Sequence, residues 1–402
     1  MLETLKKEDE VRQMEYLTAG ESHGPMLTGI VSGLPANLPI SIAAINHQLA
    51  IRQNGYGRGG RMKIEHDTVS ITAGMRAGLT TGSPLALLIQ NRDYRHWEEI
   101  MGATATNPKQ EKVVTRPRPG HADLVGGKKY DQADLRNILE RASARSTAMI
   151  VAIGNVAAQL LAQLNIHALG FVTGIGGHQL TDWPAESISD LTEKVEQNDL
   201  RLPDPGQLTA YHTVVDAARA AHTTIGGQID VRVEGLVPGL GSMQNWAQRL
   251  DGKLAGALVR IPAIKAVSFG DGVTLGEMSG AIAQDDITWT PTQGYGRSTN
   301  HLGGLEGGMT NGQPLLIHAT MKPIPTQPRG LPTIDIHTHT PTQAVNERAD
   351  VTAVPAASLV AQAMVQITLA QEILDEFSSA TLADLQASYQ DFGTRQWDRR
   401  NS

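Results

Sequence analysis

The spacing of apolar residues predicts a chain that mixes strands with long helices. Apolar positions three and four residues apart indicate helices over residues 134–164 and 355–377. The apolar face of the first helix is formed by Leu135, Ile138, Leu139 and Ala142. Strands are favoured by short runs of β-branched and aromatic residues at 15–18, 28–32, 229–233 and 266–269. This order of elements predicts an α+β fold.

A pattern of strand, Gly-Leu loop and helix occurs twice along the chain. The first copy covers residues 29–52 and the second covers residues 231–260, each with a Leu-Ala pair inside the helix. A duplication would make the chain one pseudo-symmetric domain, and chance similarity is the alternative. We therefore expect a single large domain over residues 14–402, preceded by an extension over residues 1–13.

Composition and charge exclude several classes of protein. The chain has 34 Lys+Arg and 41 Asp+Glu, and a net charge of −7 makes it a poor nucleic-acid binder. It has no cysteine, which excludes disulfides, thiolate nucleophiles and metal–thiolate sites. The charged start lacks the apolar core of a signal peptide, and no uninterrupted apolar stretch approaches 18 residues. We expect a cytoplasmic protein that binds neither nucleic acid nor membrane.

Basic charge is concentrated in one stretch of the chain. Residues 52–145 contain 16 Lys+Arg and 10 Asp+Glu, so this stretch has a net charge of +6. Its arginines lie in two Gly/Pro loops, at residues 52–61 and 116–121. The planar guanidinium group suits carboxylate and phosphate, and glycine lets backbone amides approach the same anion. The sequence therefore predicts a site for a small, multiply anionic ligand.

Residues 20–24 fit the G-x-S-x-G pattern of a hydrolase nucleophile, with Ser22 at its centre. That elbow requires a strand before the serine and a helix after it, whereas a strand-like run follows here. We interpret the segment as a turn that exposes His23, with Ser22 as a hydrogen-bond donor. A serine hydrolase that uses Ser22 is the alternative.

Three further segments carry candidate chemistry. His121 is set by a Pro-Gly turn between arginines and an aspartate, which favours a role in proton transfer. Arg141 and Arg145 would share one face of the predicted helix, either exposed or close to a ligand. The loop at residues 322–326 follows a strand and could cradle a planar, phosphorylated cofactor. His337 and His339 lie between prolines in a predicted surface loop, and we expect no metal there.

Together these segments resemble the chorismate synthase family. The matching motifs occur in the family's order at residues 20–24, 52–61, 118–123, 140–145, 300–304, 322–326, 347–350 and 353–357. The resemblance implies a single β-α-β sandwich and a homotetramer. It also implies one reaction, in which 5-enolpyruvylshikimate 3-phosphate loses phosphate and a C6 proton by anti 1,4-elimination to give chorismate. The reaction requires reduced FMN although no net redox change occurs.

The resemblance also assigns roles to particular residues. His23 would protonate the departing phosphate, His121 would protonate the reduced flavin, and Asp350 would assist removal of the C6 proton. Binding of substrate or NADP phosphate would involve Ser22, Arg52, Arg58 and Arg118. FMN would be bound by Arg141, Ala142, Ser143, Pro262, Ala263, Gly307, Lys322, Pro323, Ile324, Pro325, Thr326 and Arg348.

Two questions stay open at this level. Ser146 stands where the family usually has Glu, which puts the role of the neighbouring Arg145 in doubt. The sequence does not decide whether NADPH reduces the flavin on this protein or an external reductant supplies it. A non-catalytic flavin-binding relative is a further alternative.

Overall fold

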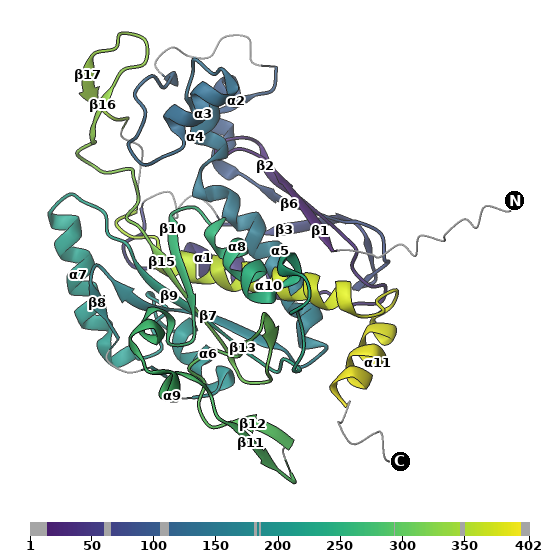
Figure 1. The fold of residues 1–402 in the computed structure, drawn as a ribbon. Coiled ribbons are helices and arrows are strands. Elements are labelled where there is room, and N and C mark those ends of the chain that lie inside the picture. Colours follow the sequence, from purple (N-terminus) through teal and green to yellow (C-terminus); the bar gives the residue numbers. More distant parts are fainter. Residues whose placement is uncertain are drawn as a thin grey trace, which may run out of the picture.

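Two antiparallel sheets enclose a layer of helices (Figure 1). The computed structural model describes residues 14–59, 66–104, 112–180, 183–184, 186–292, 294–345 and 350–394. The first sheet has the order β1-β2-β6-β3, and the second has the order β10-β15-β9-β7-β8. The strands of the first sheet are β1 (Glu15–Ala19), β2 (Met26–Ser32), β3 (Val69–Ala73) and β6 (Leu85–Gln90). Those of the second are β7 (His167–Ile175), β8 (His178–Gln179), β9 (Gly227–Glu234), β10 (Ile264–Phe269) and β15 (Leu315–Met321).

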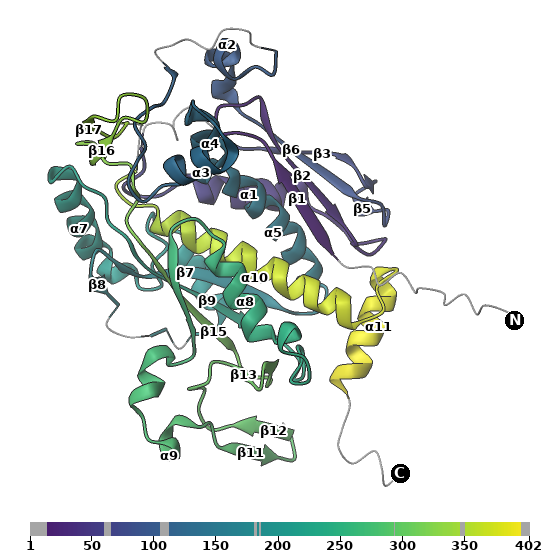
Figure 2. The ribbon, with the colours of Figure 1, turned by 45° about the horizontal axis from the view of Figure 1, so that its top comes forward.

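Four helices fill the space between the sheets, as the turned view in Figure 2 shows. They are α1 (Ile42–Gln53), α5 (Thr147–Ala162), α8 (Leu250–Val259) and α10 (Val354–Glu376). Helices α5 and α10 pack closely at Gly154, where an added Cβ would lie 2.3 Å from the Cβ of Ala363. Arg136–Ala162 and α10 are apolar and long enough to span a membrane, but 67 % and 94 % of their apolar windows are buried. Such burial is typical of core helices.

The two halves of the chain share one topology. Strands β1, β2, β6 and β3 are arranged like β7, β9, β15 and β10, with α1 and α8 at matching places in the chain. The registers also match, because Val31 pairs with Leu85 in one half and Val233 pairs with Leu315 in the other. A short hairpin comes directly before β6 and before β15 along the chain. The first hairpin pairs β4 (Met75–Arg76) with β5 (Leu79–Thr80), and the second pairs β13 (Leu305–Glu306) with β14 (Met309–Thr310).

A buried threonine on each short hairpin makes the same three hydrogen bonds. Thr80 Oγ1 accepts from Leu38 N and donates to Pro35 O, and the Thr80 N–H donates to Leu38 O. Thr310 repeats this pattern with Leu240 and Val237. Such detailed agreement supports duplication over chance similarity.

The structure confirms the predicted strands and the helix over 355–377, but the continuous helix over 134–164 is wrong. That segment forms α4 (Arg136–Arg141), a 3-10 turn η4 (Ala144–Ser146) and then α5. The break lies at Ser143, whose backbone is extended (φ −66°, ψ 142°) and whose Oγ accepts from Arg145 N. A serine that hydrogen-bonds nearby backbone competes with the helix at this point.

The remaining elements lie at the ends and on the outer faces of the sandwich. The other helices and 3-10 turns are η2 (Arg92–His96), α2 (Glu98–Met101), α3 (Asp123–Tyr130), α6 (Ile188–Glu196), η5 (Pro205–Gln207), α7 (Leu208–Ala220), η6 (Trp246–Gln248), η7 (Gly272–Glu277), α9 (Gly280–Ala283) and α11 (Leu382–Gly393). The other strands form the hairpins β11 (Ile287–Thr290) with β12 (Gly294–Arg297) and β16 (Pro332–Ile334) with β17 (Pro341–Gln343).

Candidate active site

The turn between β1 and β2 places His23 against the end of α4. The Glu140 carboxylate accepts the His23 backbone N–H at 2.8 Å and the His23 Nδ1–H at 2.9 Å. Because Nδ1 donates to this carboxylate, Nε2 is the nitrogen that can exchange a proton. Burial tends to raise the pKa of Glu140, but His23 and Arg136 outweigh burial and hold the pKa below its usual range. Glu140 is therefore an ionised hydrogen-bond partner of the His23 ring.

An aromatic ring fixes the other side of His23. The ring of Trp97 stacks on the imidazole, with centroids 4.1 Å apart and planes 25° from parallel. Arg136 lies 5.2 Å from the Trp97 centroid and forms an ion pair with Glu140 at 3.1 Å. The His23 side chain is only 12 % exposed, so the expectation of an exposed histidine is wrong.

Ser22 lies in a hairpin turn and not in a nucleophile elbow. Strand β1 precedes it and strand β2 follows it, whereas the elbow needs a helix there. Ser143 Oγ donates to Ser22 Oγ at 3.1 Å, which brings the turn to the break between α4 and α5. Arg141 and Arg145 do not share a face, because Arg141 contacts Thr18 near the surface while Arg145 is buried.

The 116–121 loop carries a second histidine paired with a carboxylate. The side chain of Asp123 is fully buried and accepts from His121 Nδ1 at 2.6 Å and from Arg118 Nε at 2.8 Å. Arg118 Nη1 also donates to Thr326 Oγ1 at 2.8 Å, so this loop is tied to the 322–326 loop. Asp123 thus orients two predicted site residues at once.

Lysine and proline residues of the 322–326 loop lie beside the start of β10. Lys322 Nζ donates to Gly120 O at 2.9 Å, and the Lys322 N–H donates to Ala263 O at 2.9 Å. Ala263 adopts a left-handed backbone (φ 73°), a strained conformation that is often held at functional sites. Burial and the charge of Lys265 lower the pKa of Lys322, so an anion here would stabilise the ammonium group.

Two buried arginine side chains form a second cluster of positive charge at the start of α5. Arg52 and Arg145 both lie near Asp67, with ion pairs of 3.9 Å and 2.6 Å. Burial, Arg58 and Arg145 outweigh the acidic neighbours and lower the pKa of Arg52 to about 9. Arg145 Nη2 is buried without a hydrogen-bond partner among the described residues. Among the described residues, both guanidinium groups share Asp67, so their positive charge is only partly compensated there.

Asp350 begins a series of contacts that links the loop carrying Arg58 to the loop carrying Lys322. Its carboxylate pairs with Arg58 at 2.8 Å and accepts from Gly59 N at 2.6 Å. The next residue, Val351, is hydrogen-bonded to Gly57 and to Ile225. Gly226 in turn packs against the backbone of Met321 and Lys322, where an added Cβ would lie 2.1 Å from Met321 O. This contact series runs from the Arg58 loop to the Lys322 loop.

Two predicted flavin-binding residues are not placed in this region. Gly307 lies in the turn of the β13–β14 hairpin, before β15, whereas Lys322 follows β15. The seven residues of β15 span about 20 Å, so Gly307 lies at the opposite end of that strand from Lys322. Arg348 lies outside the described residues. His337 and His339 lie in the turn between β16 and β17, as predicted, and Asp335 accepts from His337 N.

Sequence reasoning missed several residues that shape the site. Glu140 and Asp123 belong to the recognised motifs but were assigned no role, although each supports a histidine. Trp97, Asp67 and Asn91 carried no signal of their own, because their importance depends on partners distant in the chain. Ser146 donates to Ser143 O, while Arg145 is held by Asp67 and Asn91.

The fold and these contacts are those of an enzyme, in which two histidines, His23 and His121, are each hydrogen-bonded to a buried carboxylate and several arginines are buried in the neighbouring loops. The family model for chorismate synthase matches residues 14–374. Proteins named chorismate synthase are 50 % identical over 377 residues in Lactiplantibacillus plantarum and 48 % identical over 381 residues in Streptococcus pyogenes. These alignments cover 93 % and 94 % of this chain, and 96 % and 98 % of the relatives.

A solved crystal structure supports the same family assignment. The crystal structure of a chorismate synthase superposes with a TM-score of 0.77 at 37 % identity, covering 95 % of this chain and 97 % of that one. The chain belongs to the chorismate synthase family. It is a lyase of the shikimate pathway that forms chorismate for aromatic amino acid biosynthesis.

Proposed function

We propose that the reaction uses reduced FMN and that the site described above performs it. The observation that carries this proposal is the pairing of His23 with Glu140 and of His121 with Asp123, together with the burial of Arg52 close to Arg58 and Arg145. The substrate, 5-enolpyruvylshikimate 3-phosphate, carries two carboxylates and a phosphate. Arg58, Arg118 and Arg52 supply positive charge for these groups, and Ser22 supplies a hydroxyl.

His23 serves as the general acid for the departing phosphate. Its Nδ1–H is held by Glu140, so the proton for transfer is carried on Nε2. The nearby carboxylate stabilises the imidazolium before transfer. The stack on Trp97 fixes the plane of the ring, so that the proton donor is oriented before the C–O bond breaks.

His121 and Asp350 manage the other protons. Asp123 fixes the His121 ring through Nδ1, which leaves Nε2 to hold a proton for the reduced flavin. Arg58 pairs with the Asp350 carboxylate at 2.8 Å, and this carboxylate assists removal of the C6 proton. Two separate carboxylate–imidazole pairs let one histidine act on phosphate and the other act on the cofactor.

The residues present fit a phosphorylated flavin. Lys322 and Lys265 lie close enough for their charges to interact, so an anionic phosphate would stabilise both. Arg141, Ala142 and Ser143 at the helix break, Pro262 and Ala263 before β10, and Lys322 to Thr326 would hold the cofactor, with Arg348. When bound there, reduced FMN would supply electron density for the elimination, which is the difficult part of this chemistry.

Assembly completes the proposal. In a homotetramer, the β13–β14 turn of a neighbouring copy brings Gly307 to the site that its own chain leaves distant. NADPH is the proposed reductant, and the enzyme acts in the cytoplasm as one domain over residues 14–402 behind the extension at 1–13. The retained His23, His121 and Asp350 argue against a non-catalytic flavin-binding relative.

Substitution of His121 tests the catalytic role proposed for this residue. His121→Ala should bind FMN as the wild type does, measured by flavin absorbance and fluorescence titration, but should lose turnover by about 10²- to 10⁴-fold. The matched control is His47→Ala on α1, whose side chain is 62 % exposed, and it should keep full turnover. Wild-type turnover in His121→Ala would remove this residue from the mechanism.

A further inference from the structure

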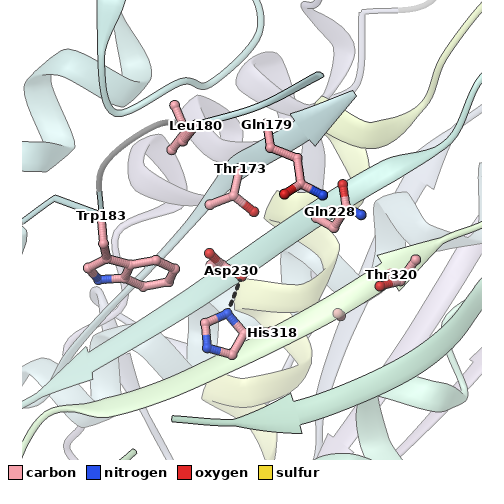
Figure 3. A pocket seen from close by; sticks show the side chains of 9 residues that line it. Thr173, Gln179, Leu180, Trp183, Gln228, Asp230, His318 and Thr320 are labelled. Carbon is pink, nitrogen blue, oxygen red and sulfur yellow. Dashed lines mark hydrogen bonds and ion pairs between the residues drawn. The ribbon is translucent and has the colours of Figure 1, made fainter. Parts of the chain in front are cut away.

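A small cavity lies on the outer face of the second sheet (Figure 3). Its volume is about 240 Å³, and it is lined by Thr173, Gln179, Leu180, Trp183, Gln228, Asp230, His318, Ala319 and Thr320. On β9 the neighbours of Asp230, Ile229 and Val231, belong to the main core, so Asp230 points to the opposite face. None of the lining residues belongs to the proposed active site.

An ion pair between the buried Asp230 and the half-buried His318 forms the floor of this cavity. His318 Nδ1 lies 2.7 Å from Asp230 Oδ1, and His318 Nε2 lies 2.7 Å from the carbonyl oxygen of Gly270. Burial tends to lower the pKa of His318, but these two acceptors outweigh burial and raise the pKa. Both ring nitrogens therefore donate, and the imidazolium has no N–H left for a ligand.

Two oxygens at the cavity can accept further hydrogen bonds. Gln228 Oε1 is buried and has no hydrogen-bond partner among the described residues, and the Asp230 carboxylate, which faces the Thr173 hydroxyl, keeps acceptor capacity on its buried Oδ2. Buried polar atoms without a partner cost free energy, so a ligand that donates to them is favoured. Gly174 makes room for this arrangement, because an added Cβ there would lie 2.1 Å from Gln228 Oε1.

An aromatic side chain forms one wall. Trp183 meets His318 edge to face at 5.1 Å and Phe171 at 5.7 Å, and it is still 41 % exposed. Figure 3 shows its ring opposite Gln179 and Gln228, with Leu180 above the floor. An indole face attracts flat apolar groups and organic cations.

We propose that this cavity binds a small molecule with a flat apolar body and an ammonium or amidinium head. The head donates N–H to Asp230 Oδ2 and Gln228 Oε1, and the body packs on Trp183 and Leu180. Carboxylates and phosphates are disfavoured, because their negative charge would lie against the Asp230 carboxylate. The volume lies below the roughly 300–1,000 Å³ of sites for drug-sized ligands, so the ligand is of single-ring size.

Benzamidine is a suitable probe, and benzoate is its acceptor-only counterpart of the same shape. Binding to the full-length protein can be followed by saturation-transfer NMR, which needs neither flavin nor turnover. We expect benzamidine to bind and benzoate not to bind. Gln228→Leu removes one acceptor and Trp183→Ala removes the wall, and each should weaken benzamidine binding at least tenfold.

The matched control is Trp289→Ala on the β11–β12 hairpin, whose side chain is 60 % exposed, and it should bind benzamidine normally. Because the Trp183 side chain is partly exposed, we expect Trp183→Ala to fold normally. Circular dichroism checks the fold of both variants. Absence of benzamidine binding, equal binding of benzoate, or undiminished binding to a correctly folded Trp183→Ala would overturn the proposal. Because the readout is binding, its failure is distinguishable from failure of the proposed flavin chemistry.

Discussion

Glu140 holds His23 by two hydrogen bonds across 117 positions of sequence, one to the backbone N–H and one to Nδ1. The first bond fixes the turn between β1 and β2, and the second fixes the ring. A single buried carboxylate therefore sets both the position and the proton-bearing nitrogen of the histidine.

Glu140→Gln tests this relationship. The amide keeps a hydrogen-bond acceptor but loses the charge that stabilises the imidazolium. We expect kcat to fall by about 10²-fold or more and the alkaline limb of the pH–rate profile to move to lower pH. Glu15→Gln on the exposed edge strand β1 is the control and should leave both quantities unchanged. An unaltered pH profile in Glu140→Gln would mean that Glu140 has only a structural role.

Asp123 makes stability depend on acidity. Burial tends to raise its pKa, but hydrogen bonds from His121 and Arg118 outweigh burial and hold the pKa below its ordinary value near 4. A carboxyl with a lowered folded-state pKa contributes stability above its unfolded pKa and loses that contribution as the pH falls.

Asp123→Asn should therefore cost on the order of 1–3 kcal/mol of unfolding free energy at pH 7. The difference from the wild type should begin to shrink as the pH falls from 5 to 3, because the Asp123 carboxyl takes up a proton there in the unfolded state but resists protonation in the folded state. Urea unfolding across this pH range measures the difference. A gap that stays constant with pH would show that the Asp123 charge does not contribute.

The repeated threonines predict matched effects in the two halves. Thr80→Val and Thr310→Val each leave a buried backbone N–H and a buried carbonyl without a partner. Each should cost about 1–3 kcal/mol in urea unfolding, and the two costs should be similar. Thr288→Val, on the exposed strand β11, should change stability by about 0.5 kcal/mol or less. Sharply unequal costs would argue that the two hairpins are not equivalent.

The sequence predicted local elements well where they follow a simple period. The helix over 355–377 was predicted within one residue at each end, because α10 is apolar on all sides and begins with a proline in its first turn. The break at Ser143 was missed. Ser143 Oγ accepts from Arg145 N and donates to Ser22 Oγ at this point, and apolar spacing does not reveal such hydrogen bonds.

The site was predicted by its motifs and less well by its geometry. The structure brings Arg118, His121, Lys322 and Thr326 together, as expected of one site. The supporting partner of His23 could not be assigned from sequence spacing, because Glu140 reaches it only through the fold. Gly307 shows a further limit, since one chain places it at the opposite end of β15 from Lys322.

The most direct test is an anaerobic assay with 5-enolpyruvylshikimate 3-phosphate and chemically reduced FMN, following chorismate absorbance and phosphate release. We predict equal amounts of chorismate and phosphate, many turnovers per flavin, and no net oxidation of FMN. A parallel sample with oxidised FMN and NADPH tests NADPH as the reductant, and it should also turn over. If FMN binds but no chorismate forms with the reduced cofactor, the proposed role of the site is contradicted.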